Sequence, residues 1–116
     1  MRTVIVDIET DAIDATVVWC VGTREAGAYH SWYSSDNYKN LAVYLADADR
    51  VVMHNGVGFD WYILRDLLGI TIPRHKVWDT LVASRLHDPM RRSHSLKAWG
   101  LDLGCHKGDF TDFSCL

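Results

Sequence analysis

Short runs of apolar residues, many of them β-branched, alternate with polar stretches along the first half of the chain. Runs of this kind predict β-strands, which we expect over residues 3–9, 15–23, 28–33 and 50–54. The turn-like stretch at residues 24–27 predicts that the second and third strands form a hairpin.

Apolar residues at helical spacing predict the helices. The first follows the N-cap residues 34–37, and its apolar stripe ends at Ala48; the others are expected over residues 58–68, 80–87 and 96–101. No helix separates the first three strands, whereas helix and strand alternate after them. This order predicts an α/β fold with a mixed sheet and helices on its faces, and it fits a wholly parallel sheet less well.

Length and charge narrow the class of protein. A chain of 116 residues has room for one domain, residues 1–116. No apolar run is long enough for a membrane span, and Met1 leads directly into a strand instead of a signal peptide, so we expect a cytoplasmic protein without a membrane partner. Residues 1–60 carry nine acidic and four basic side chains, and residues 61–116 carry six and eight. This asymmetry fits a metal site beside a phosphate-facing surface, but it is also common in proteins that have neither.

Three acidic residues are the first candidates for chemistry. Asp7 and Glu9 lie two apart on the first strand, so their side chains point to the same face of the sheet. Asp60 begins the helix after the fourth strand, and it approaches them if that strand lies beside the first. Neighbouring carboxylates repel one another, and a hard cation such as Mg²⁺ or Mn²⁺ relieves that repulsion. Alternatively, the strand acids face water and Asp60 stabilises a helix N-terminus.

Four ordered blocks of sequence carry a family resemblance. The segment Asp7-Ile8-Glu9-Thr10 resembles the first motif, DxET, of the DEDD superfamily of 3′→5′ exonucleases. The segment HNGVGFD, which ends at Asp60, resembles the HNxxxFD form of the second motif. Two later blocks, DTLVASRL from Asp79 and HSLKAWG from His94, are similar to the proofreading domain of A-family DNA polymerases of podophages.

The resemblance implies a ribonuclease H-like fold with a mixed sheet of about five strands. It also implies two-metal hydrolysis of the terminal phosphodiester at a DNA 3′ end, with Mg²⁺ or Mn²⁺ as the cofactor. Carried over to this sequence, Asp7 would bridge both ions, Glu9 would bind the first and orient the attacking water, and Asp60 would hold the second. The implied partners are a single-stranded DNA 3′ end and, in the full-length relative, a polymerase domain, in a bacterial or phage-infected cell.

The third family motif is absent from the sequence. It supplies a fourth carboxylate behind a Tyr or His and lies beyond the last of these blocks, where the tail from Phe110 to Leu116 contains neither YxxxD nor HxxxD. Asp109 and Asp112 are the acids available there as replacements. We therefore expect a chain truncated before that motif and its C-terminal helix, a metal site that is only partly occupied, and activity that is weak or absent. The sheet face left bare by the missing helix predicts a homodimer.

Several other residues have both a functional and a structural interpretation. Asp79 either caps the next helix or hydrogen-bonds near the site, and His54 is expected to be a buried, hydrogen-bonded histidine instead of a metal ligand. Aromatic side chains near Asp60 either stack on a base or pack in the core, and the basic group around Arg91 contacts phosphate or is simply solvated. The candidate nucleic-acid-binding residues are Thr10, Asn55, Phe59, Trp61, Arg91, Arg92 and Lys97.

The sequence thus predicts a 3′→5′ exonuclease domain of the proofreading type. Two alternatives stay open. One is a catalytically silent fragment that binds nucleic acid or has a structural role. The other is a ribonuclease of the same superfamily, because nothing in the sequence locates a contact to the 2′-hydroxyl of RNA.

Overall fold

The computed structural model describes residues 1–33 and 35–105. The chain divides into two compact units, residues 1–80 and residues 81–116. The expectation of a single domain over residues 1–116 stays a prediction.

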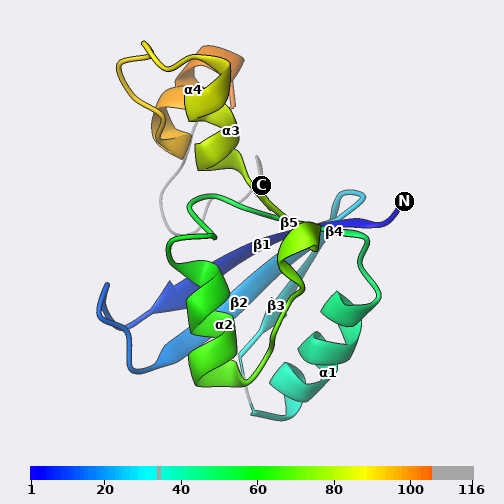
Figure 1. Ribbon diagram of the computed structural model, residues 1–116. Coiled ribbons are helices and arrows are strands. Elements are labelled where there is room, and N and C mark those ends of the chain that lie inside the picture. Colours follow the sequence, from blue (N-terminus) through cyan, green and yellow to red (C-terminus); the bar gives the residue numbers. More distant parts are fainter. Residues whose placement is uncertain (34, 106–116) are drawn as a thin grey trace. The chain divides into compact units, whose positions relative to one another are not determined.

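The first unit is built on a five-stranded mixed sheet (Figure 1). Its strands are β1 (Thr3–Thr10), β2 (Val18–Glu25), β3 (Ala28–Trp32), β4 (Arg50–Met53) and β5 (Val77–Asp79). Their order across the sheet is β3-β2-β1-β4-β5. β2 pairs antiparallel with β1 and β3, whereas β4 pairs parallel with β1 and β5. The mixed sheet predicted from the sequence is therefore confirmed.

Turn chemistry explains the antiparallel part of the sheet. Ala26 and Gly27 connect β2 to β3, and both have positive φ angles, 48° and 85°. Such angles match the right-handed twist of the flanking strands, so the two-residue connection closes the predicted hairpin. β4 instead follows a crossover helix, α1 (Ser35–Ala46), which allows it to run parallel to β1.

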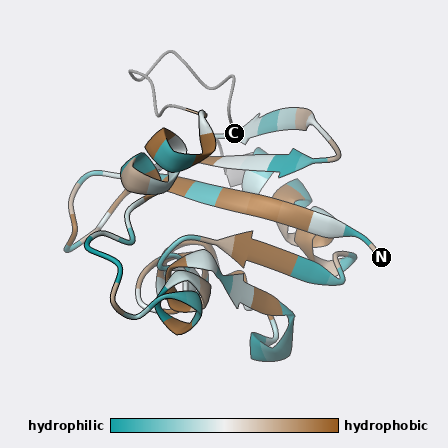
Figure 2. Cartoon of the chain, turned by 90° about the horizontal axis from the view of Figure 1, so that it is seen from above, coloured by the Kyte–Doolittle hydropathy of each residue, from teal (hydrophilic) through white to brown (hydrophobic). Residues whose placement is uncertain are grey.

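Both helices of the first unit cover one face of the sheet (Figure 1). α1 contributes Leu41 and Leu45 to the core, and α2 (Asp60–Leu68) contributes its buried apolar residues, among them Leu64. On β1 the buried residues are Val4, Val6 and Ile8, which alternate with exposed ones. In Figure 2 this strand, next to the N-terminus, is largely coloured as hydrophobic. The sheet therefore buries one face and leaves polar positions on the other.

Several element boundaries differ from the sequence prediction, and one strand was not predicted. The expected strand over residues 15–23 begins only at Val18, because the Asp11 carboxylate accepts hydrogen bonds from the backbone N–H groups of Thr16 and Val17 and holds a turn. Residues 58–59 precede α2 instead of belonging to it. β5 was not expected from its residues, since three residues are too few for a periodic signal; its pairing with β4 makes it a strand.

The second unit contains α4 (Leu96–Leu103) and most of α3 (Thr80–His87). Ser95 caps α4, since its hydroxyl accepts the N–H of Ala98 at 3.1 Å. Ser84 on α3 is buried, and its Oγ accepts the indole N–H of Trp99 at 2.7 Å and lies 2.6 Å from Nδ1 of His94. This hydroxyl links two helices and the loop between them.

None of the described helices has the length and apolar character needed to cross a membrane.

Candidate active site

Asp7 and Glu9 lie on the face of β1 opposite to the one covered by α1 and α2. Both are exposed, whereas Val6 and Ile8 point into the core. Glu9 pairs across the strands with Cys20, and burial together with the charges of Glu9 and Asp7 raises the pKa of that thiol. The two carboxylates therefore share one face of the sheet, as the sequence predicted, and both raise the pKa of the Cys20 thiol.

The loop from His54 to Phe59 carries the chain from β4 into α2. Asn55 adopts a left-handed conformation, with φ of 60°, which asparagine tolerates better than most residues. A Cβ atom at Gly56 would lie 2.3 Å from Cβ of Met53, so only glycine fits this close approach. Gly56 then accepts the N–H of Trp61 at 2.8 Å through its carbonyl oxygen. The loop is thus tightly folded where it delivers Asp60.

Asp60 is the first residue of α2 and is only 6% exposed. Its pKa is raised to about 7, first by burial and then by the charges of Asp7, Asp79 and Glu9. A carboxyl group buried beside other carboxylates resists ionisation for both reasons. The structure therefore brings the three acidic residues predicted from the sequence within electrostatic reach of one another.

Asp79, at the end of β5, adds a fourth carboxylate to this neighbourhood. Its Oδ1 accepts the N–H of Asn55 at 2.8 Å, and its Oδ2 accepts the N–H of Val57 at 3.0 Å. Of the two roles that the sequence leaves open for Asp79, a helix cap or a hydrogen bond near the site, the structure shows hydrogen bonds to the loop before Asp60. The only sequence signal was the acidic residue that opens the DTL block.

His54 is hydrogen-bonded, as expected, but it is only half-buried. Its Nδ1 lies 2.9 Å from Oγ1 of Thr80, whose hydroxyl donates to the carbonyl oxygen of Met53 at 3.3 Å.

The carboxylates at this site have the chemistry that a hard divalent cation requires. Oxygen ligands of this type are preferred by Mg²⁺ and Mn²⁺, and a cation would offset the repulsion that raises the pKa of Asp60. Within residues 1–33 and 35–105, however, no three His, Cys, Asp or Glu side chains are grouped closely enough to hold a metal ion as they stand. The donor set therefore fits a cation, whereas the arrangement of the side chains is not that of a closed metal site.

Four candidate nucleic-acid contacts belong to the first unit. The Thr10 hydroxyl donates to the carbonyl oxygen of Ala12 at 2.8 Å and so supports the turn after β1. Asn55 is exposed, whereas Phe59 packs against the core. Trp61 is 7% exposed, and its indole N–H donates to the carbonyl oxygen of Ile72 at 2.7 Å. The structure thus favours the packing interpretation for both aromatic residues.

The other three candidates belong to the second unit. The Arg91 guanidinium lies 3.9 Å from the centre of the Trp99 ring and forms a 2.6 Å ion pair with Asp102. It also donates to the carbonyl oxygen of Ser93 at 2.6 Å, so Arg91 has a structural role within this unit. Arg92 and Lys97 are exposed.

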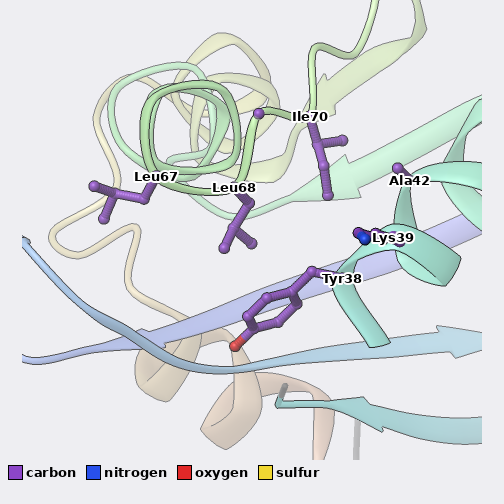
Figure 3. A pocket seen from close by; sticks show the side chains of 7 residues that line it. Tyr38, Lys39, Ala42, Leu67, Leu68 and Ile70 are labelled. Carbon is purple, nitrogen blue, oxygen red and sulfur yellow. The ribbon is translucent and has the colours of Figure 1, made fainter. Parts of the chain in front are cut away.

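The first unit also has a surface groove (Figure 3). It runs between α1 and the C-terminal end of α2, and its lining is largely apolar. The lining residues are Tyr38, Lys39, Ala42, Leu67, Leu68, Gly69 and Ile70. None of the acidic residues predicted for the site contributes to it.

The five-stranded sheet and its helices match the fold of known nucleases. The apo form of a nuclease superposes with a TM-score of 0.76 and 22% identity, covering 98% of this chain and 58% of the other. NrnC of Brucella melitensis, solved with bound Mg²⁺, gives a TM-score of 0.75 and 23% identity, covering 97% of this chain and 58% of that chain. The chain therefore has the ribonuclease H-like α/β fold expected from its motifs.

In sequence, the chain is similar to a phage DNA polymerase. The chain is 34% identical to a DNA-directed DNA polymerase of Enterobacteria phage T3 over 113 residues, covering 74% of this chain and 16% of the polymerase. No protein-family model matches the chain. In sequence and fold together, the chain resembles a DEDD exonuclease domain of a phage DNA polymerase. It spans less than a fifth of the length of that relative.

The predicted replacements for the fourth carboxylate, Asp109 and Asp112, lie outside the described residues.

Proposed function

We propose that this chain is a 3′→5′ exonuclease domain of the proofreading type, which removes mononucleotides from the 3′ end of single-stranded DNA in the presence of Mg²⁺ or Mn²⁺. The observation that carries the proposal is the buried Asp60 carboxyl, whose pKa is raised to about 7 by burial and by its acidic neighbours. Strongly perturbed carboxyl groups of this kind are typical of functional sites. The resemblance to a phage DNA polymerase favours DNA as the substrate.

The roles that we propose for the three acidic residues are those that the family resemblance implies. Two divalent cations bound there would stabilise the attacking and the leaving oxygen of the phosphodiester. We assign Asp7 to both ions, Glu9 to the first ion and to the orientation of the attacking water, and Asp60 to the second ion. Asp60 must lose its proton to serve as a ligand, so cation binding should weaken as the pH falls below about 7.

The proposal is tested with 3′-labelled single-stranded DNA and purified chain in Mn²⁺ or Mg²⁺. We expect stepwise shortening from the 3′ end that stops in EDTA and is abolished by Asp7→Ala. Asp14→Ala, an exposed acid in the turn after β1, is the matched control and should retain the wild-type rate. Shortening that survives Asp7→Ala would refute the proposed site. RNA of the same sequence, run in parallel, identifies the ribonuclease alternative if RNA alone is degraded.

A silent nucleic-acid-binding fragment is the second candidate. The observation that favours it is that no group of three metal-binding side chains is preformed among the described residues. DNA binding without digestion in either metal would support it. A polymerase domain as the partner, a cytoplasmic location and a homodimer stay predictions; a clean monomer at high concentration would contradict the homodimer.

A further inference from the structure

Both carboxylate oxygens of Asp79 are used to hold the loop that precedes α2. They accept the backbone N–H groups of Asn55 and Val57, at 2.8 and 3.0 Å, and the residue is only 9% exposed. Hydrogen bonds to an ionised acceptor are stronger than those between neutral groups, and exclusion from water strengthens them further. A buried side chain of β5 therefore fixes two points of a loop that is distant in sequence.

The position of Asp60 depends on this loop because α2 has no side-chain cap. Phe59 occupies the N-cap position, and its side chain accepts no hydrogen bond from the helix. The first turn is attached instead to backbone carbonyl groups of the loop. Gly56 accepts the N–H of Trp61 at 2.8 Å, and Phe59 accepts the N–H of Ile63 at 3.1 Å. A shift of the loop would therefore move the beginning of the helix and Asp60 with it.

We propose that Asp79 is a positioning residue, which places the Asp60 carboxyl against Asp7 and Glu9 by holding the backbone of the His54–Phe59 loop. The inference rests on the proposed function for its kinetic consequence, whereas its structural consequence can be measured without any activity. Outer groups that orient metal ligands commonly affect metal affinity or activity by about 10- to 100-fold.

The charge of Asp79 is a separate influence that the test must distinguish. Asp79 also acts electrostatically on Asp60. Asp79→Asn preserves the size of the side chain but replaces one acceptor oxygen with an N–H₂ group, which would face a backbone N–H. A role through charge alone would leave the loop hydrogen bonds protected from exchange, whereas a positioning role would not.

The first measurement is amide hydrogen exchange of ¹⁵N-labelled, metal-free protein. In Asp79→Asn we expect the amides of Asn55 and Val57, and that of Trp61 in the first turn of α2, to exchange about tenfold faster. The amide of Val6 in the core of β1 reports global stability, and its exchange rate should not rise along with those of the loop amides. Asp49→Asn is the matched control, because its carboxylate accepts the backbone N–H of Arg2 at 2.6 Å, beside the N-terminal ends of β1 and β4.

The second measurement is a titration with Mn²⁺, followed by electron paramagnetic resonance and by DNA digestion. Asp79→Asn should weaken Mn²⁺ binding and lower kcat by about 10- to 100-fold, with KM for DNA within about twofold of the wild type. Asp49→Asn should match the wild type in both.

Unchanged exchange at Asn55 and Val57 in Asp79→Asn would overturn the inference, as would faster exchange with wild-type Mn²⁺ binding and kcat. If the wild-type chain digests no DNA, the proposed function fails while exchange and Mn²⁺ binding still decide the role of Asp79. If it also binds no Mn²⁺, exchange at Trp61 decides whether Asp79 orders the start of α2.

Discussion

The carboxyl group of Asp60, at the first residue of α2, lies within reach of the charge of Asp7 on β1, and this charge is the strongest influence on its pKa after burial. The two residues come from distant parts of the sequence, and the parallel pairing of β4 with β1 brings them together. A buried acid beside another acid opposes folding when both are ionised. Such an arrangement costs stability and is typical of sites whose purpose is binding or catalysis.

The first prediction concerns the pH dependence of stability without metal. The pKa of Asp60 is about 7 in the folded chain, above the ordinary value of 3.8 expected after unfolding. Between these values the folded state binds more protons, so the free energy of unfolding should fall as the pH rises from about 4 to 7, by a few kcal/mol. Urea unfolding in EDTA at several pH values measures this change.

Asp60→Asn provides the control for that measurement, since an amide does not titrate. In the variant, the free energy of unfolding should fall much less as the pH rises. At pH 8 the variant should therefore be more stable than the wild type. Adding Mg²⁺ should restore stability at pH 8 to the wild type but not to the variant. Equal pH profiles for the two proteins would contradict the proposed environment of Asp60.

The second prediction concerns the shape of the loop before α2. In Gly56→Ala the new methyl group would lie 2.3 Å from Cβ of Met53, so strand and loop must separate. We expect a loss of about 1–3 kcal/mol in the free energy of unfolding, together with weaker Mn²⁺ binding.

Gly58→Ala is the matched control two residues away. Its methyl group would lie 2.8 Å from Oδ1 of Asn55, the end of a side chain on an exposed residue that has room to rotate. The loss of stability should be clearly smaller than for Gly56→Ala. The reverse order would show that the backbone of this loop is not tightly constrained.

The third prediction tests the hydrogen bonds of the second unit. Ser84→Ala removes the oxygen that accepts the Trp99 indole N–H and contacts His94. Because the indole N–H and the imidazole then lose their hydrogen-bond partner, the free energy of unfolding should fall by about 1–3 kcal/mol. The change should appear in the near-ultraviolet circular dichroism of tryptophan. Ser93→Ala, which removes an exposed hydroxyl with long hydrogen bonds to Ser95, at 3.2 and 3.4 Å, should lower the free energy of unfolding less than Ser84→Ala.

The fourth prediction distinguishes basic residues that bind DNA from one that stabilises the fold. Arg92 and Lys97 are exposed, so replacing both by Ala should weaken single-stranded DNA binding and reduce the slope of log K against log salt by about 1.4. Arg91→Ala should instead lower thermal stability, because its guanidinium contacts Trp99 and Asp102. Fluorescence anisotropy at several salt concentrations provides the measurement. An unchanged slope for the double variant would remove Arg92 and Lys97 from the proposed interface.

The local pattern of apolar residues predicted most of the strands and helices, but not which of them pack or pair with one another. The strands around Val4 and Val51 and the helix around Leu64 have periodic apolar residues, which arise from burial on one face. β5 has no such signal, since only its pairing with β4 defines it. The start of β2 was placed too early because the hydrogen bonds of Asp11 to the following turn do not show in hydropathy.

The sequence by itself determined which side chains are available: the paired acids Asp7 and Glu9 on one face of a strand, and Asp60 after a glycine-rich turn. These follow from strand periodicity and local backbone preferences, which act over a few residues. Only the tertiary structure decided that Asp60 is buried within reach of the other two carboxylates, and that Asp79 holds the loop before it. Burial and electrostatic interaction depend on distances through space, and strand pairing sets those distances.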